Sequence, residues 1–206
     1  MNVLPDFIKA PIVGILRGFD LATCHQIAEA YQNAGLKYLE ITMNTKGVEE
    51  IIASLVAKFP SLKIGAGTVC TMDDYKKAIN AGASFIVTPI IDLAVIRKAV
   101  DMGIPIFPGA YTPTEIFQAW SAGATAVKVF PAGALGSSYI KDVLGPLNEI
   151  KLLPTGGVSK ENIKEFLQAG AVGAGMGGTL FPKELIHDKN WTKLEEHFKS
   201  VLSAAT

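Results

Sequence analysis

Short apolar runs recur along the chain, and each follows the end of an amphipathic stretch. At five of these ends a glycine stands beside small residues, and the next apolar run begins almost at once. These glycines are Gly35, Gly82, Gly103, Gly123 and Gly170. Glycine just past a helix end is the expected left-handed cap, and a short loop then carries the chain into a strand. The pattern therefore predicts helices that alternate with buried strands.

Eight apolar runs are the candidate strands of this pattern. They cover residues 12–16, 38–41, 63–67, 85–88, 105–107, 126–130, 151–154 and 172–176. Helical stretches of roughly 10–15 residues separate them, as βαβ units require. Eight such units form either a (β/α)8 TIM barrel or a large doubly wound sheet. Because the repeat is even, with no interruption to mark a reversal of the sheet, we expect one α/β domain over residues 1–206, folded as a (β/α)8 barrel.

Polar residues mark several of the predicted helix starts. Asp20, Thr71 and Ser159 each precede a helical stretch and can accept a hydrogen bond from a first-turn N–H group. Thr112 is followed by Pro113, and proline is well tolerated in the first turn. We therefore expect these residues to begin helices.

Charge and composition narrow the possible partners and compartment. The 19 basic residues balance 19 acidic ones, so nothing favours binding to nucleic acid or to an anionic membrane. No apolar run approaches the length of a membrane span. Residues 1–6 lack the basic and apolar regions of a signal peptide, and Cys24 and Cys70 have no metal-ligand spacing. These features predict a cytoplasmic protein with free thiols.

Lys128 stands alone inside the apolar run 126–130. The β-branched and aromatic residues around it predict a strand buried on both faces, which normally excludes an ammonium group. Burial favours the neutral amine, and a neutral lysine can attack a ketone to form a Schiff base. The alternative is a lysine at a strand end that extends its charge into solvent.

Glu40 and Arg17 are the other charged residues at predicted strand ends. Burial would raise the pKa of Glu40 towards neutrality, which suits proton transfer, whereas an ion pair with a neighbouring strand is the alternative. Arg17 could bind a carboxylate through two parallel hydrogen bonds, or lie on the surface at the start of a loop. In a barrel the carboxyl ends of the strands share one face. Lys128, Glu40 and Arg17 would then supply an amine, a proton carrier and an anion clamp.

The last two predicted strands end in glycines. Backbone N–H groups of Gly156 and Gly157, and of the turn Gly177, Gly178 and Thr179, could bind a phosphate, which barrels often hold after strands seven and eight.

Metal ligands are missing from the predicted strand ends. His25, His187 and His197 fall in helical stretches far from those ends, and no group of His, Cys or Asp has a metal-ligand spacing. We therefore expect neither a metal nor a cofactor, and favour a covalent amine mechanism.

Taken together, ordered short motifs give the chain a family resemblance. They are GILRG (14–18), LEIT (39–42), GAGTV (65–69), PG (108–109) with TPTE (112–115), KVFPA (128–132) and PTGGV (154–158). From about residue 12 to residue 181 the chain resembles the 2-keto-3-deoxy-6-phosphogluconate (KDPG) / 4-hydroxy-2-oxoglutarate (KHG) aldolases. The resemblance implies a class I aldolase with a (β/α)8 fold, usually a homotrimer.

The resemblance also assigns roles to individual residues. It implies that Lys128 forms the Schiff base, that Glu40 is the general acid and base, and that Arg17 and Thr68 bind the pyruvyl carboxylate. It further implies that the two glycine segments, 156–157 and 177–179, bind the phosphate.

At two positions the chain departs from the family pattern. Many members carry arginine where this chain has Asn44, so carboxylate binding would fall to Arg17. The last turn usually reads Gly-Ser, whereas here Gly178 and Thr179 follow Gly177, so a phosphate-binding hydroxyl is missing or displaced to Thr179.

The activity predicted on these grounds is cleavage of KDPG, a small 2-keto acid, to pyruvate and D-glyceraldehyde 3-phosphate. Cleavage of 4-hydroxy-2-oxoglutarate to pyruvate and glyoxylate is a second activity within this class, and the galactonate epimer of KDPG is an alternative substrate. Two other classes remain open: a non-covalent phosphate-binding isomerase or synthase, and a sugar-acid sensor without activity.

Overall fold

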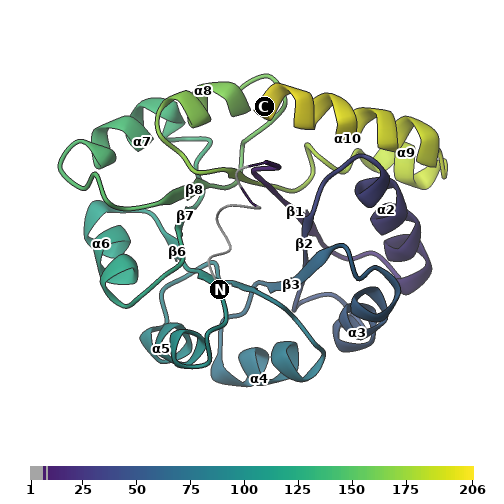
Figure 1. The fold of residues 1–206 in the computed structure, drawn as a ribbon, viewed down its shortest axis with the longest axis horizontal. Coiled ribbons are helices and arrows are strands. Elements are labelled where there is room, and N and C mark those ends of the chain that lie inside the picture. Colours follow the sequence, from purple (N-terminus) through teal and green to yellow (C-terminus); the bar gives the residue numbers. More distant parts are fainter. Residues whose placement is uncertain (1–6, 8) are drawn as a thin grey trace.

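The protein has an α/β fold in which a curled parallel sheet lies inside a layer of helices (Figure 1). The computed structural model describes residue 7 and residues 9–206. The prediction that residues 1–6 are not part of a signal peptide concerns a segment outside the described residues. In the described part, no helix is both long enough and apolar enough to cross a membrane.

Nine strands form two parallel sheets within the described residues. The first has the order β5-β4-β3-β2-β1-β9 and the second the order β6-β7-β8. The strands are β1 (Ile12–Leu16), β2 (Tyr38–Thr42), β3 (Lys63–Gly67), β4 (Ile86–Val87), β5 (Ile106–Phe107), β6 (Gly109–Ala110), β7 (Val127–Val129), β8 (Leu152–Pro154) and β9 (Ala174–Met176). Each of the eight predicted runs overlaps one strand, and β6 is an addition. Pro108 separates β5 from β6 because proline has no N–H group for the ladder.

The edges of the two sheets also meet at β8 and β9. Thr155, directly after β8, forms a parallel bridge with Gly175 of β9. The backbone N–H of Val172 donates to the carbonyl of Leu152 at 3.0 Å. The second sheet therefore continues the curvature of the first.

Helices follow the strands and cover the outside of the sheet (Figure 1). They are α2 (Leu21–Asn33), α3 (Val48–Lys58), α4 (Met72–Asn80), α5 (Leu93–Asp101), α6 (Pro113–Ser121), α7 (Gly136–Leu144), α8 (Ile163–Gln168), α9 (Lys183–His187) and α10 (Trp191–Ala205). The five glycines past helix ends have φ between +66° and +105°, which confirms the predicted left-handed caps.

Three of the four predicted helix starts are confirmed. Asp20 caps α2 by accepting from the N–H of Thr23, and Thr71 and Thr112 form capping boxes. The prediction for Ser159 is wrong, since α8 begins at Ile163. The side chain of Asn162 accepts from the N–H of Ser159 at 2.8 Å and holds this segment in a turn.

Apolar side chains pack on both sides of the sheet. One cluster lies between the sheet and the helices. A smaller inner cluster consists of Phe7, Val13, Tyr38, Phe85, Val87, Phe107, Ala126 and Leu153. Side chains alternate between the faces of a strand, so residues two positions further along point to the same inner side. Glu40 is two positions after Tyr38, and Lys128 is two positions after Ala126, so both lie on the inner face next to this apolar cluster.

Candidate active site

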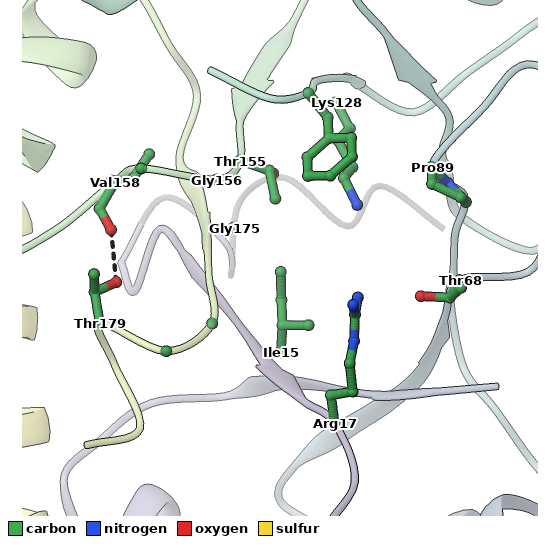
Figure 2. A pocket seen from close by; sticks show the side chains of 14 residues that line it. Ile15, Arg17, Thr68, Pro89, Lys128, Thr155, Gly156, Val158, Gly175 and Thr179 are labelled. Atoms are coloured by element: carbon green, nitrogen blue, oxygen red, sulfur yellow. Dashed lines mark hydrogen bonds between the residues drawn. The ribbon is translucent and has the colours of Figure 1, made fainter. Parts of the chain in front are cut away.

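A cavity of about 500 Å³ opens at the carboxyl ends of the strands. It is lined by Ile15, Arg17, Thr68, Pro89, Lys128, Phe130, Thr155, Gly156, Gly157, Val158, Gly175, Gly177, Gly178 and Thr179. Eight of the nine residues predicted for the site are in this lining, and the ninth, Glu40, is buried beside it. The side chains of Arg17, Lys128 and Thr68 point into the same space (Figure 2).

Lys128 lies in the middle of β7 and is only 6% exposed. Burial lowers the pKa of its amine, and the charge of Arg17 acts in the same direction, whereas Glu40 opposes both. The Nζ atom lies 4.8 Å from the centre of the Phe130 ring. A lysine in this setting has more of its neutral, nucleophilic form at neutral pH than an exposed lysine.

Glu40 is 1% exposed, in the third position of β2. Burial raises the pKa of its carboxyl group to about 7, while the charges of Lys128 and Arg17 limit the rise. Its Oε2 atom is buried and has no hydrogen-bond partner in the described part of the chain. A carboxyl group with a pKa near neutrality and a free oxygen is suited to exchange protons with a water or substrate.

Gly67, at the end of β3, leaves the space that Glu40 occupies. A Cβ atom at this position would lie 2.1 Å from Oε1 and 2.6 Å from the carboxyl carbon of Glu40. The strand pairing explains this approach, because Glu40 is opposite Gly65 and the next inward position of β3 is Gly67. The glycine is therefore required by the position of the carboxyl group.

Gly67→Ala is expected to displace Glu40 and to destabilise the protein by about 1–3 kcal/mol, the usual effect of overpacking. We expect a lower kcat as well, because the carboxyl group must leave its position. Urea unfolding and steady-state kinetics measure both effects. Gly178→Ala is the control for stability, since a Cβ atom there meets nothing within 4 Å. Normal stability and kcat in Gly67→Ala would contradict this account.

Arg17 and Thr68 lie directly after β1 and β3. Arg17 is exposed, and its guanidinium group reaches into the cavity (Figure 2). Thr68 has φ of +55°, a left-handed conformation that is unfavourable for a β-branched residue and costs on the order of 1–3 kcal/mol. Its hydroxyl group points into the cavity (Figure 2). Strain of this kind gathers at functional sites, so it supports a functional role for Thr68.

The glycine segments after β8 and β9 form the other side of the cavity. Gly156 and Gly157 have φ of +81° and +80°, and a Cβ atom on Gly157 would lie 2.5 Å from the Cα atom of Gly133. The hydroxyl group of Thr179 donates to the carbonyl of Val158 at 2.6 Å (Figure 2). This bond joins the two segments. Because it uses the proton of the Thr179 hydroxyl group, the remaining hydrogen-bond donors for an anion in these segments are backbone N–H groups.

The histidines lie in helices as predicted, but one of them is not far from the strand ends. His197 of α10 has its Nε2 atom 3.1 Å from the carbonyl oxygen of Thr179, so it contacts the turn after β9. The prediction is wrong for His197 because this residue is 18 positions after Thr179 in the sequence, but α10 passes the turn in the folded chain. Cys24 and Cys70 are free thiols, as predicted. Among residues 9–206, no group of three His, Cys, Asp or Glu side chains could hold a metal ion.

Six lining residues were not predicted as members of the site. They are Ile15, Pro89, Phe130, Thr155, Val158 and Gly175. Their position near strand ends could have indicated that they line the site, but their neutral side chains do not distinguish them from other residues at strand ends. Gly175 shows how such residues contribute, since a Cβ atom there would lie 2.4 Å from the Thr155 hydroxyl oxygen.

The cavity thus brings together five kinds of group. The buried amine of Lys128 lines it, and the Glu40 carboxyl group, with a pKa of about 7, is buried beside it. A guanidinium group and a hydroxyl group enter from one side, and the glycine segments, which carry backbone N–H groups, line the opposite side. This arrangement suits covalent attack on a ketone that carries a carboxylate at one end and a second anion at the other.

Known proteins resemble this chain over nearly its whole length. The family model of KDPG and KHG aldolase matches residues 5–197. The 2-dehydro-3-deoxy-6-phosphogalactonate aldolase of Escherichia coli (strain K12) is 39% identical over 177 residues, which is 84% of this chain and 85% of that protein. The 2-dehydro-3-deoxy-phosphogluconate aldolase of Pseudomonas aeruginosa is 34% identical, covering 93% of this chain and 86% of its own length.

A solved structure has the same fold. It is the KDPG aldolase from Legionella pneumophila with pyruvate captured at low pH as a covalent carbinolamine intermediate. It is 28% identical to this chain, with a TM-score of 0.88, and the match covers 98% of this chain and 99% of that one.

Proposed function

The chain belongs to the KDPG and KHG aldolase family, and we propose that it cleaves KDPG to pyruvate and D-glyceraldehyde 3-phosphate through a Schiff base on Lys128. The observation that carries this proposal is the buried amine of Lys128 in a cavity that it shares with Arg17 and with the glycine segments. Cleavage of 4-hydroxy-2-oxoglutarate would use the same amine without a phosphate.

In the first step the neutral amine of Lys128 attacks the C2 ketone. The ketone oxygen takes a proton, and the resulting carbinolamine loses water to form an iminium ion. Glu40 supplies and removes these protons, because a carboxyl group with a pKa of about 7 is populated in both forms near neutral pH. Arg17 and Thr68 hold the neighbouring carboxylate, which places C2 beside the amine.

In the second step Glu40 takes the proton of the C4 hydroxyl group. The C3–C4 bond breaks, its electron pair moves into the C2–C3 bond, and the iminium ion becomes an enamine. The aldehyde leaves with the phosphate that the N–H groups of Gly156, Gly157, Gly177 and Gly178 had bound. Thr179 braces this phosphate site through Val158. The enamine then takes a proton at C3, and water hydrolyses the imine to release pyruvate and the free amine.

A second candidate substrate is the galactonate epimer of KDPG. It is favoured by the 39% identity to the phosphogalactonate aldolase, which exceeds the 34% identity to the phosphogluconate aldolase. The two acids differ in configuration at C4, so the position of Glu40 relative to C4 would decide between them.

Steady-state kinetics with both epimers and with 4-hydroxy-2-oxoglutarate tests the proposal. We expect pyruvate as a product and the highest kcat/KM with a phosphorylated acid. Borohydride reduction in the presence of pyruvate should add a pyruvyl mass to Lys128. If neither cleavage nor an adduct is found with folded protein, the phosphate-binding isomerase or synthase becomes the better explanation.

Gly178→Ser is expected to strengthen phosphate binding. A Cβ atom at this position meets nothing within 4 Å, so serine fits and offers a hydroxyl donor to the phosphate. One hydrogen bond to a charged group corresponds to a decrease in KM of about tenfold for the phosphorylated substrate. The KM for 4-hydroxy-2-oxoglutarate is the internal control and should not change. Equal decreases for both substrates would contradict phosphate binding by this turn.

Three larger features of the organisation are also proposed. Closure into a (β/α)8 barrel is supported by the Thr155–Gly175 bridge between the two sheets. A single domain over residues 1–206 agrees with the extent of the family match. A homotrimer, expected from the family resemblance, is supported by large apolar side chains that are more than half exposed, Ile90, Met102 and Phe117.

A further inference from the structure

Arg17 enters the cavity from a loop that does little to fix its side chain. The residue is exposed, and its guanidinium group makes no hydrogen bond or ion pair with another residue in the described part of the chain. Gly18, the next residue, has φ of +76° and gives the loop a left-handed turn. The position of the guanidinium group therefore depends on how the backbone is held at residues 17 and 18.

That backbone is tied to the end of β2 by one side chain. The N–H of Gly18 donates to the hydroxyl oxygen of Thr45 at 3.1 Å. The Thr45 hydroxyl is also 3.1 Å from the Thr42 hydroxyl, in a bond where either group can donate. Thr42 and Thr45 are both buried, so water does not easily replace the bond between their hydroxyl groups, whereas the bond to the exposed Gly18 is partly buried. The two hydroxyl groups form a link between β2 and the loop that carries Arg17.

The same link reaches the strand that holds Glu40. Thr42 is the last residue of β2 and stands two positions after Glu40, so both side chains are on the inner face. Glu40, the proposed proton carrier, and Arg17, the proposed carboxylate-binding residue, are thus both positioned relative to β2. The backbone of Thr45 is held independently, because its N–H donates to the Thr42 carbonyl at 2.9 Å. Removal of the hydroxyl group alone would release Gly18 and leave this turn in place.

We propose that Thr45 is a positioning residue, which orients Arg17 for the substrate carboxylate by fixing the Gly18 backbone. This inference rests on the proposed function, in which Arg17 binds the carboxylate of the 2-keto acid. Thr45 itself does not line the cavity. Its effect on the reaction passes through Arg17, so it concerns substrate binding more than the steps that break bonds.

Thr45→Val tests this role, because valine keeps the shape of threonine and removes the hydroxyl group. We expect KM for the phosphorylated acid to rise about fivefold, as the loss of one net hydrogen bond predicts, while kcat stays within about twofold. Thr45→Ser should restore KM. The matched control is Thr125→Val, since Thr125 also accepts a backbone N–H at 3.1 Å, from Ile106, at the opposite ends of the strands. That control should leave KM unchanged.

A double-mutant cycle with Arg17→Met separates positioning from a general structural effect. Arg17→Met should raise KM by itself, and Thr45→Val should then add nothing, because the group that it positions is gone. Additive effects, an unchanged KM in Thr45→Val, or an equal change in Thr125→Val would overturn the inference. Wild-type protein that forms no pyruvyl adduct and cleaves no substrate would instead contradict the proposed function.

Discussion

Lys128→Ala is expected to abolish the pyruvyl adduct and to lower kcat by about 10⁴-fold or more, as removal of a covalent nucleophile does in other enzymes. In the proposed mechanism this amine is the nucleophile, and its iminium ion is the electron sink for cleavage of C3–C4. Arg17 and Glu40 remain in the variant, but neither can form an imine with the ketone. Borohydride trapping with pyruvate and steady-state kinetics measure the two effects.

Folding is not expected to suffer in this variant. Lys128 is buried, and burial disfavours its charged form, so its removal takes away a desolvation cost together with the contact to Phe130. Lys63→Ala is the matched control, because Lys63 is also a strand residue but is exposed at the start of β3. It should trap pyruvate like the wild type. An adduct in folded Lys128→Ala would show that another amine performs the chemistry.

Glu40→Gln is expected to lower kcat by about 10²–10⁴-fold, the usual contribution of general acid–base catalysis. Glutamine keeps the shape of the side chain but cannot exchange a proton. In the wild type, kcat/KM should rise through about pH 7 as the carboxylate forms, because the base that takes the C4 hydroxyl proton must be ionised. The variant should lose this part of the pH profile. Glu29→Gln, an exposed position on α2, is the control.

The same substitution should change how stability depends on pH. The folded-state pKa of Glu40, about 7, lies above its ordinary value of 4.5, so the folded protein binds more protons between these pH values. The free energy of unfolding then falls as pH rises from about 4.5 to about 7. The stability that the raised pKa contributes is therefore fully present only below this pH window. Glu40→Gln lacks this dependence, so the variant should gain stability relative to the wild type as pH rises. Urea unfolding of both proteins across this window measures the difference, and a constant difference would contradict the raised pKa.

Much of the strand pattern was predictable from local periodicity. The bounds of β1 and β3 agree with the predicted runs 12–16 and 63–67. The run 85–88 was predicted too long, since β4 contains only Ile86–Val87. Apolar runs report burial, whereas a strand ends where its ladder hydrogen bonds end. β6 was missed because Pro108 and Gly109 are typical of a chain break, although Gly109 pairs with Lys128 in the ladder.

The site was predictable where one residue contradicted its surroundings. Lys128 and Glu40 are ionisable residues in apolar strands, which made burial one of two interpretations, and the structure shows that both are buried. Thr45 gave no such signal, because its partner Gly18 is 27 residues away and a threonine near a strand end is ordinary. His197 was placed far from the strand ends for a similar reason, since α10 passes the turn after β9 only in the folded chain.

By itself, the sequence determined the alternation of helices and strands and the chemical identity of the groups that we propose to react. Periodicity and helix caps depend on near neighbours, and an apolar run around a charged residue stands out in the order of residues, so these features can be read from the sequence. Only the tertiary structure decided the strand register, which brings Glu40 beside Gly67 and gathers Lys128, Arg17 and the glycine segments around one cavity. It also decided that the Thr179 hydroxyl bonds Val158 and that Thr45 holds Gly18. These contacts join residues far apart in the chain, and their partners exist only once the strands have paired.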